Sequence, residues 1–394
     1  MLVSSIHELL LKLHQQQLLI GLESLSSEEL HDFSLQLQKY SPLLSAEQKK
    51  GNTHLSPQPY LKHERSGDQK RGEMLIGQGK VGCLILAGGQ GTRLGFDGPK
   101  GCFPVTPMTR KSLFQLFCER TKGASIGSGH LLPLCIMTSP SNHAQTEEFL
   151  QKSGYFGLAS SQISFIQQEM LPLLDDRGQW LLEKPGKIAE GPDGNGHALK
   201  LFFTSGIWEK WKASGIEYLN VIFVDNALAD PFDPEFVGFA SEKGVDVALK
   251  AVERLSPDEK MGVLAECEGK LKVIEYTELP ADVSQFTLSS TGMFLFSMEF
   301  IRYLYQQQSV ELPIHLARKK TTVLLGTSKG YVQETAHVWK CERFLFDLLD
   351  HARSSAVMVC QRDKIYAPLK NATGEKSIET VKQALLLHDN EMYH

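Results

Sequence analysis

The 394-residue sequence has few cysteines, no long apolar run and no excess of positive charge. The seven cysteines are odd in number, widely spaced and never in a C-x-x-C pair, which argues against a disulfide framework or a zinc site and favours a reducing compartment. No apolar run reaches the length of a membrane span, and the amphipathic start of the chain is not a signal-peptide core. With a net charge of −5, the composition gives no support to a general nucleic-acid or acidic-membrane partner. We therefore expect a cytosolic protein that binds neither nucleic acid nor membrane.

Recognisable metal and nucleophile patterns are also missing. The 13 histidines show no metal-ligand spacing, and there is no nucleophilic triad. His197 fits either a site residue or a surface histidine at the start of a helix. Any catalytic chemistry must therefore rest on residues that form neither a metal-ligand pattern nor a nucleophilic triad.

The composition, with 42% hydrophobic and 22% charged residues, is that of an ordinary globular protein. The first fifty residues predict helices, because Ser26 with Glu29 and Ser45 with Gln48 have the spacing of capping boxes. Residues 49–71 are polar and uneven, which predicts an irregular connection. We divide the chain into a helical N-terminal segment with its linker, residues 1–75, and one large domain, residues 76–394.

Strands and helices alternate from Val81 onward, which is typical of an α/β fold whose mostly parallel sheet is covered by helices on both faces. A hairpin that turns near Glu268 and Gly269 predicts that part of the sheet is mixed. We expect single helices over residues 198–211 and 341–353, and a strand over residues 356–360.

A glycine-rich loop, "LAGGQGTRLGFDGPKG", follows the first strand of this domain. Pro99 and the prolines after it make an immediate helix improbable, so the loop is not a dinucleotide fingerprint, and "GPKG" is not a P-loop. Glycines at a strand end let backbone N–H groups approach phosphate oxygens, and Arg93 and Lys100 add positive charge. The loop alone fits a phosphate site or a plain turn with basic residues on the surface.

A family resemblance favours the phosphate site. The motifs "LAGGQGTRLG", "FIQQEMLP", "GPDGNG", "VDN", "VIEYTE" and "PLKNA" occur in this order, and between about Val81 and His388 the chain resembles the eukaryotic-type UDP-N-acetylhexosamine pyrophosphorylases. The resemblance implies a three-layer nucleotide-binding (nucleotidyltransferase, GT-A-like) fold with a mixed, mostly parallel central sheet. Residues 76–394 would then be the catalytic domain.

The resemblance also implies the site residues. It implies a UTP site made of Leu86, Ala87, Gly88, Gly89, Lys100, Gln168, Gly194, Asp225 and Lys340. It implies a sugar site made of Asn195, Glu275, Tyr276, Ser290 and Lys370. Arg93, Lys100 and Lys370 would act on the reacting phosphates, and Asp225 would hold a divalent cation, Mg²⁺ or Mn²⁺. Gln168 and Gly194 would recognise the uracil.

Each of these residues also has an ordinary structural interpretation. Gln168 fits a surface amide at a strand end, and Gly194 with Asn195 fits a turn. Glu275 and Tyr276 fit a cross-strand contact. Lys340 and Lys370 fit solvated surface lysines. The ordered set of motifs favours the functional interpretation.

The implied reaction is uridylyl transfer from UTP to a hexosamine 1-phosphate, with release of pyrophosphate. Three hypotheses stay open: N-acetylglucosamine 1-phosphate as acceptor, glucose 1-phosphate as acceptor with the same chemistry, and an inactive sugar-nucleotide-binding protein. The loop reads "GGQGT", whereas "GGLGT" is more typical of UDP-glucose enzymes, and Arg93, Lys100 and Asp225 are all present, so the first hypothesis is favoured.

Two departures from the family pattern bear on this choice. Ser290 stands where the family's acetamido-contacting asparagine falls, which leaves N-acetylglucosamine, glucose and N-acetylgalactosamine open as the sugar. Larger relatives continue beyond the segment matching "ALLLH", so we expect their extra C-terminal domain to be absent and the protein to be a monomer.

Overall fold

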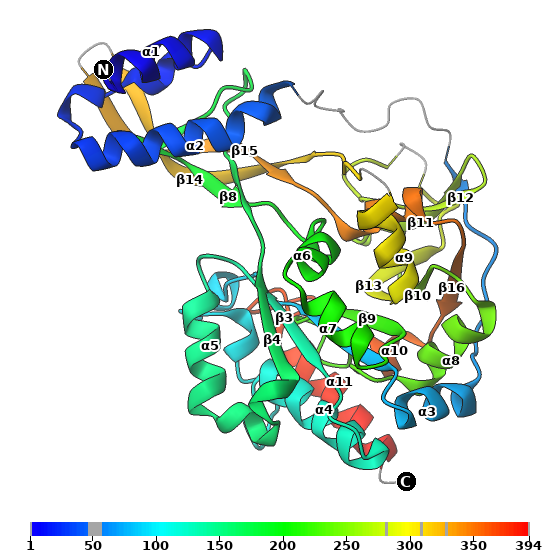
Figure 1. Ribbon diagram of the computed structural model, residues 1–394. Helices are drawn as coiled ribbons and strands as arrows, with labels where there is room; N and C mark the ends of the chain where they lie inside the picture. The colour runs from blue at the N-terminus through cyan, green and yellow to red at the C-terminus, as the bar shows by residue number, and fades with distance from the viewer. Residues whose placement is uncertain (1, 46–56, 280–282, 308–309, 328–329, 393–394) are drawn as a thin grey trace. The chain divides into compact units, whose positions relative to one another are not determined.

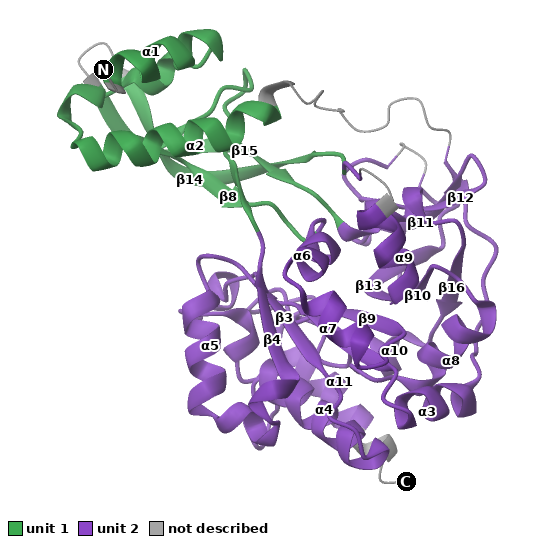
Figure 2. Cartoon of the chain, viewed as in Figure 1, with its two compact units in different colours: residues 1–53, 169–195, 312–344 green, residues 54–168, 196–311, 345–394 purple. Residues whose placement is uncertain are grey.

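A computed structural model describes residues 2–45, 57–279, 283–307, 310–327 and 330–392 (Figure 1). The chain forms two compact units (Figure 2). Unit 1 comprises residues 1–53, 169–195 and 312–344, and unit 2 comprises residues 54–168, 196–311 and 345–394. The sequence-based division after residue 75 stays a prediction.

Unit 2 is built on a ten-stranded mixed sheet. Its strands are β1 (Gln58–Pro59), β2 (Val81–Leu86), β3 (Leu134–Thr138), β4 (Ile163–Gln167), β9 (Tyr218–Phe223), β10 (Val247–Glu253), β11 (Val263–Cys267), β12 (Lys270–Ile274), β13 (Leu288–Ser297) and β16 (Ser355–Val359). The order is β1-β11-β13-β9-β2-β3-β4, with β10 between β13 and β16 and with β12 beside β11. Strands β9, β2, β3 and β4 are parallel neighbours, whereas β13 runs antiparallel to β9 and β10. The carboxyl ends of β9, β2, β3 and β4 therefore meet at one edge.

Helices cover both faces of this sheet, as the alternation along β2 shows. Val81, Cys83 and Ile85 point into one core, which they share with residues of α3, α4, α8 and α11. On the opposite face, a Cβ atom added to Gly82 would lie 2.4 Å from the ring of Trp211 in α7. The expected three-layer α/β arrangement is confirmed.

The helices of unit 2 are α3 (Gln69–Gly77), α4 (Leu113–Ser128), α5 (His143–Lys152), α6 (Ala198–Thr204), α7 (Ile207–Ala213), α8 (Pro234–Lys243), α9 (Met298–Arg302), α10 (Arg362–Ile365) and α11 (Ile378–Met392). Shorter helical segments are η3 (Thr92–Leu94), η4 (Lys100–Cys102), η5 (Gly154–Gly157), η6 (Ser160–Gln162), η7 (Tyr303–Gln307) and η8 (Leu345–His351).

Two helix predictions were wrong. The stretch 198–211 forms two helices, because Gly206 adopts a left-handed conformation with φ of 79° between α6 and α7. Of residues 341–353, only Leu345–His351 are helical, as a 3₁₀ segment, because Cys341 pairs with Leu316 in a β-ladder. Tertiary pairing overrides the local helical pattern there.

Unit 1 joins the N-terminal helices to a four-stranded and a two-stranded sheet. Its elements are α1 (Leu2–Lys12), η1 (Gln16–Leu19), η2 (Leu22–Ser24), α2 (Ser27–Ser45), β5 (Met170–Pro172), β6 (Leu182–Lys184), β7 (Lys187–Ile188), β8 (Glu190–Pro192), β14 (His315–Thr327) and β15 (Gly330–Glu342). The fully buried Trp180 packs edge-on against Tyr40, whose hydroxyl donates to Glu190 at 2.6 Å. Segments from three parts of the sequence therefore share one core.

The turn and capping signals were mostly reliable. Ser26 and Glu29 form the predicted capping box, with each side chain bonded to the other residue's backbone N–H, whereas Ser45 with Gln48 extends outside the described residues. Glu268 and Gly269 both have positive φ and join β11 to β12, as predicted. The predicted irregular connection over 49–71 contains β1 and the start of α3 within its described part, so that prediction was too broad.

Candidate functional site

The glycine-rich loop leaves the carboxyl end of β2 without starting a long helix. Its backbone folds back on itself, because the Gly91 N–H donates to the Gly98 carbonyl at 2.8 Å and the Lys100 N–H donates to the Gly89 carbonyl at 3.1 Å. Only the three-residue segments η3 and η4 intervene before α4 begins at Leu113. The prediction of a glycine loop without a following helix is confirmed.

Asn142 holds this loop, and the sequence reasoning missed it. Its side chain is 1% exposed, and its Nδ2 donates to the carbonyls of Ala87 at 2.9 Å and of Gly89 at 3.2 Å. Its Oδ1 accepts the N–H of Ser139 at 2.8 Å. The loop therefore takes its shape from a buried amide at the start of α5. The only hint in the sequence is a Ser-Asn pair between a strand and a helix.

Gly88 and Gly89 contact very different surroundings. A Cβ atom at Gly88 would lie 2.0 Å from Nε2 of Gln168, so only glycine lets the loop approach that amide. Nothing lies within 4 Å of the corresponding position at Gly89, and Gly89 is exposed. Gln168 is 6% exposed and is not the surface amide that its sequence context allows. The loop thus offers open backbone next to a buried, polar side chain.

Asp225 follows β9 at the same sheet edge and faces two lysines. Its Oδ2 lies 3.9 Å from Nζ of Lys100 and 4.0 Å from Nζ of Lys370. Both distances exceed a hydrogen bond, so the three charged groups are close without being in direct contact. Lys370 is brought there by Leu369, whose N–H donates to the Asp225 carbonyl at 2.7 Å. Residues from three distant parts of the sequence meet here.

Positive charge dominates this group. Burial lowers the pKa of the Lys100 ammonium, and the charges of Lys370 and Arg93 lower it further, while Asp225 opposes the shift. Arg93 is exposed on the loop. Two lysines and an arginine around one carboxylate leave an excess of positive charge, which suits a polyanion.

Two of the predicted sugar contacts lie near one another: Ser290 on β13 and Glu275 directly after β12. The Ser290 N–H donates to the Gly262 carbonyl at 2.9 Å, and a Cβ atom at Gly262 would lie 3.7 Å from Oε1 of Glu275. Tyr276 follows and is 44% exposed. The Ser290 hydroxyl accepts the N–H of Gly292 at 3.2 Å. The hydroxyl extends only a short distance from the backbone, and one of its hydrogen bonds is made within its own strand.

The remaining predicted residues belong to unit 1. Gly194 has φ of 94°, and a Cβ atom there would lie 2.5 Å from the Arg343 carbonyl, so glycine is required by backbone packing. Arg343 donates to the buried Asp193 at 2.8 Å. Lys340 forms an ion pair with Glu342 at 2.5 Å, so it is not simply a solvated lysine. Asn195 is the last residue of the unit's second segment.

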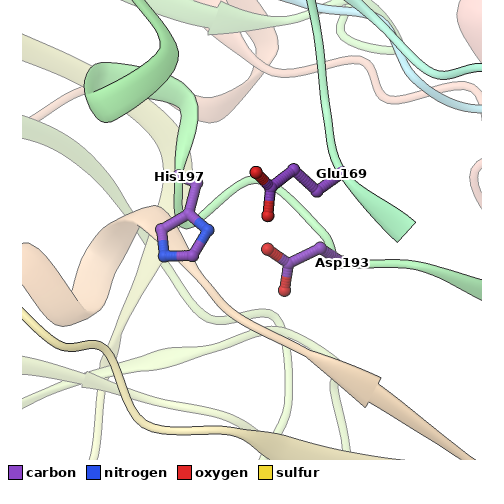
Figure 3. Close-up of side chains that lie close together, drawn as sticks. All are labelled: Glu169, Asp193 and His197. Carbon is purple, nitrogen blue, oxygen red and sulfur yellow. The ribbon is translucent and has the colours of Figure 1, made fainter. Parts of the chain in front are cut away.

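The oxygens of Glu169 and Asp193, both in unit 1, lie within 4.8 Å of each other (Figure 3). His197, also drawn in Figure 3, belongs to unit 2. Because Asp193 is engaged by Arg343 in a buried ion pair, we assign no metal to this group.

Comparisons with known proteins identify the family of the chain. The family model described as UTP–glucose-1-phosphate uridylyltransferase matches residues 28–394. The chain is 34% identical over 349 residues to UDP-N-acetylglucosamine diphosphorylase 2 of Arabidopsis thaliana, which covers 83% of this chain and 68% of that protein. It is 31% identical over 392 residues to the UDP-N-acetylglucosamine pyrophosphorylase of Saccharomyces cerevisiae, covering 92% and 82%.

A solved structure gives the same result for the fold. The uridine diphosphate N-acetylglucosamine pyrophosphorylase of Trypanosoma brucei superposes with a TM-score of 0.76 at 27% identity, covering 98% of this chain and 85% of that one. No helix among the described residues is long and apolar enough to cross a membrane. The chain is thus a nucleotidyltransferase that belongs to the UDP-sugar pyrophosphorylase family.

Proposed function

We propose that the protein transfers the uridylyl group of UTP to N-acetylglucosamine 1-phosphate and releases pyrophosphate. The observation that carries the proposal is the group formed by Lys100, Asp225 and Lys370, which lies at a strand-end edge beside the open backbone of Gly89. Ligands of α/β sheets bind at such an edge. The relatives named for this sugar, at 31–34% identity, support the choice of substrate.

The reaction needs no general base, because the attacking sugar phosphate is already ionised. Its oxygen attacks the α-phosphorus of UTP in line, a bond to that phosphorus forms, and the bond to the departing pyrophosphate breaks. The obstacle is the approach of two polyanions and the charge that develops on the leaving oxygens. Fixed positive groups lower that barrier through positioning and electrostatic stabilisation.

In this proposal each residue has a defined task. Lys100 binds the phosphates of UTP, Arg93 faces the departing pyrophosphate, and Lys370 holds the sugar phosphate. The nucleotide also contacts Leu86, Ala87, Gly88, Gly89 and Gln168, and the sugar contacts Glu275, Tyr276 and Ser290. The roles that the resemblance implies for Gly194, Asn195 and Lys340, which belong to unit 1, stay predictions. The seven free thiols are consistent with a reducing compartment, and we propose the cytosol.

The donor set suits a Mg²⁺ ion that arrives with the nucleotide. Mg²⁺ is commonly held by one or two carboxylates together with substrate phosphates. The Asp225 carboxylate is 17% exposed, and neither lysine lies within hydrogen-bond distance of it. When bound, the cation would neutralise phosphate charge beside Asp225. Mn²⁺ would serve the same purpose.

A second acceptor, glucose 1-phosphate, is favoured by one observation. Ser290 stands where the resemblance implies an asparagine, and its hydroxyl is partly engaged by Gly292. A site built to hydrogen-bond an amide rejects an analogue that lacks it, because its own polar group is left without a partner. When glucose 1-phosphate binds, a serine hydroxyl can still find a hydrogen-bond partner, since a water molecule can satisfy it. Discrimination between the two sugars should therefore be narrow.

The test is a pyrophosphate-release assay that compares kcat/KM for the two sugar phosphates with UTP. We expect N-acetylglucosamine 1-phosphate to be preferred. A clear preference for glucose 1-phosphate would overturn the choice of sugar, and Ser290→Asn should then shift the ratio back toward the acetamido sugar. An absence of pyrophosphate release with every sugar 1-phosphate would overturn the reaction itself.

A further inference from the structure

Asp225 and Lys370 are far apart in sequence, yet their charged atoms lie 4.0 Å apart. Lys370 is 43% exposed and its side chain is long, so the position of its backbone decides where the ammonium can reach. That backbone is part of an irregular segment between α10 and α11. Something outside the segment must therefore hold it in place.

The side chain of Asn226 contacts this segment with both ends of its amide. It is 1% exposed, and its Nδ2 donates to the Ile365 carbonyl at 2.8 Å. Its Oδ1 accepts the Ala367 N–H at 2.9 Å. One residue beside Asp225 thus satisfies a carbonyl and an N–H just before Lys370.

These two backbone groups need such a partner. Ile365 ends α10, and the carbonyls of a last helical turn lack partners within the helix. Ala367 is buried, so an unpaired N–H there would cost free energy. An aliphatic side chain of the same size could satisfy neither group, and a carboxylate could accept from Ala367 but could not donate to Ile365. Asparagine satisfies both.

We propose that Asn226 is a positioning residue for the transfer reaction. Together with the backbone bond from Leu369 to Asp225, it holds the 365–369 segment against the end of β9 and thereby sets the distance between the Lys370 ammonium and the Asp225 carboxylate. The inference rests on the proposed function, in which Lys370 contacts the sugar phosphate. A misplacement of about 1 Å can cost about 100-fold in rate, so a small shift of the segment suffices.

The same strand offers a matched control. Asn220, in β9, is 2% exposed, and its Nδ2 donates to the carbonyls of Asp230 at 3.1 Å and Pro231 at 2.9 Å. It is a buried asparagine bonded to backbone, like Asn226, but Asp230 and Pro231 lie outside the Lys370 segment. Asn220→Ala therefore reports the cost of losing such an amide without moving Lys370.

The experiment is a double-mutant cycle on pyrophosphate release, with Asn226→Ala, Lys370→Ala, both changes together, and Asn220→Ala. Asn226→Ala should lower kcat/KM for the sugar phosphate by about 100-fold, with KM for UTP changed by less than about threefold. In the Lys370→Ala background the same change should cost less than about threefold, because the residue through which it acts is gone. Asn220→Ala should lower the melting temperature comparably and leave kcat/KM within about threefold.

Losses that multiply in the double variant would contradict the inference, as would an equal loss of activity from Asn220→Ala. If Asn226→Ala does not fold, Asn226→Asp takes its place in the cycle, because it keeps the shape and the acceptor for Ala367. A wild-type chain that releases no pyrophosphate with any sugar 1-phosphate would contradict the proposed function and the inference with it. Multiplying losses in an active enzyme would contradict the inference alone.

Discussion

Two aspartates that follow β9, Asp225 and Asp233, each lie beside lysines, and the two groups differ in how tightly they are paired. Asp233 caps α8 and forms a direct ion pair with Lys250, whose side chain is 3% exposed. Asp225 stands 3.9 Å from Lys100 and 4.0 Å from Lys370, and these three side chains are 12–43% exposed. In the first group the two opposite charges are directly paired, whereas the second has surplus positive charge and no direct pair. We therefore propose that the same residue types serve structure in one group and ligand binding in the other.

The electrostatics of the two lysines follow this difference. Burial opposes the charge of Lys250, but the Asp233 carboxylate more than offsets it and raises the pKa of Lys250. For Lys100, burial prevails, the neighbouring cations reinforce it, and the pKa is lowered. A lysine that is poorly neutralised by its own protein gains most from a phosphate.

The largest effect should come from removing the cation. We expect pyrophosphate release to vanish with EDTA and to return with added Mg²⁺, because the triphosphate and the Asp225 carboxylate must share one site. Asp225→Asn should stay at least about 100-fold impaired even at high Mg²⁺. Full activity in the chelator would rule out a metal requirement. Full activity of Asp225→Asn would show that other residues hold the metal.

Lys100→Ala should lower kcat/KM by about a thousandfold, because it removes charge stabilisation at the reacting phosphates. Its free energy of unfolding should change by less than about 1 kcal/mol, since Lys100 is not in a direct ion pair. Steady-state kinetics and urea unfolding measure the two quantities. Near-normal turnover of Lys100→Ala would show that Lys100 does not act on the reacting phosphates.

Lys250→Met should show the opposite pattern. Breaking a buried ion pair strands the remaining charge, so the free energy of unfolding should fall by about 3–5 kcal/mol. The folded variant should keep kcat/KM within about threefold of the wild type. The double variant Lys250→Met with Asp233→Asn should recover most of the stability, because asparagine still caps α8 and no charge is stranded. A Lys250→Met enzyme that is stable but inactive would reverse the assignment of the two groups.

The smallest effect should appear in the pH dependence of kcat/KM, which reports the free enzyme. Because burial lowers the pKa of Lys100, its charge is lost, as the pH rises, earlier than that of an ordinary lysine. Activity should therefore decline on the alkaline side. Lys100→Arg, which stays charged, should move that decline to higher pH at a reduced rate. If the alkaline decline of kcat/KM stays at the same pH in Lys100→Arg, the decline is caused by a group other than Lys100.

Local signals in the sequence predicted much of this architecture. The Ser26 capping box, the hairpin turn at Glu268 and Gly269, and the glycine loop were all found from residue type and spacing. Each depends on backbone conformations or short contacts that a few neighbouring residues determine.

The sequence did not reveal the buried amides that shape the site. Asn142 and Asn226, the latter the last residue of the "VDN" motif, act on backbone groups of distant segments, and nothing in the local sequence marks such a distant partner. The long pair β14 and β15 was also missed, because its register depends on tertiary pairing. The motifs located the charged residues, but the 3.9 and 4.0 Å separations required the fold.

We propose that the loosely spaced group, and not the tight pair, binds the nucleotide. Calorimetric titration of Mg²⁺–UTP into the wild type, Lys100→Ala and Lys250→Met tests it directly. Loss of a hydrogen bond to a charged group costs about 1.5–3 kcal/mol, so Lys100→Ala should weaken binding by about 10- to 100-fold, and folded Lys250→Met should bind UTP as the wild type does. Equal affinity of Lys100→Ala and the wild type for UTP would contradict the assignment of the nucleotide site to the loosely spaced group.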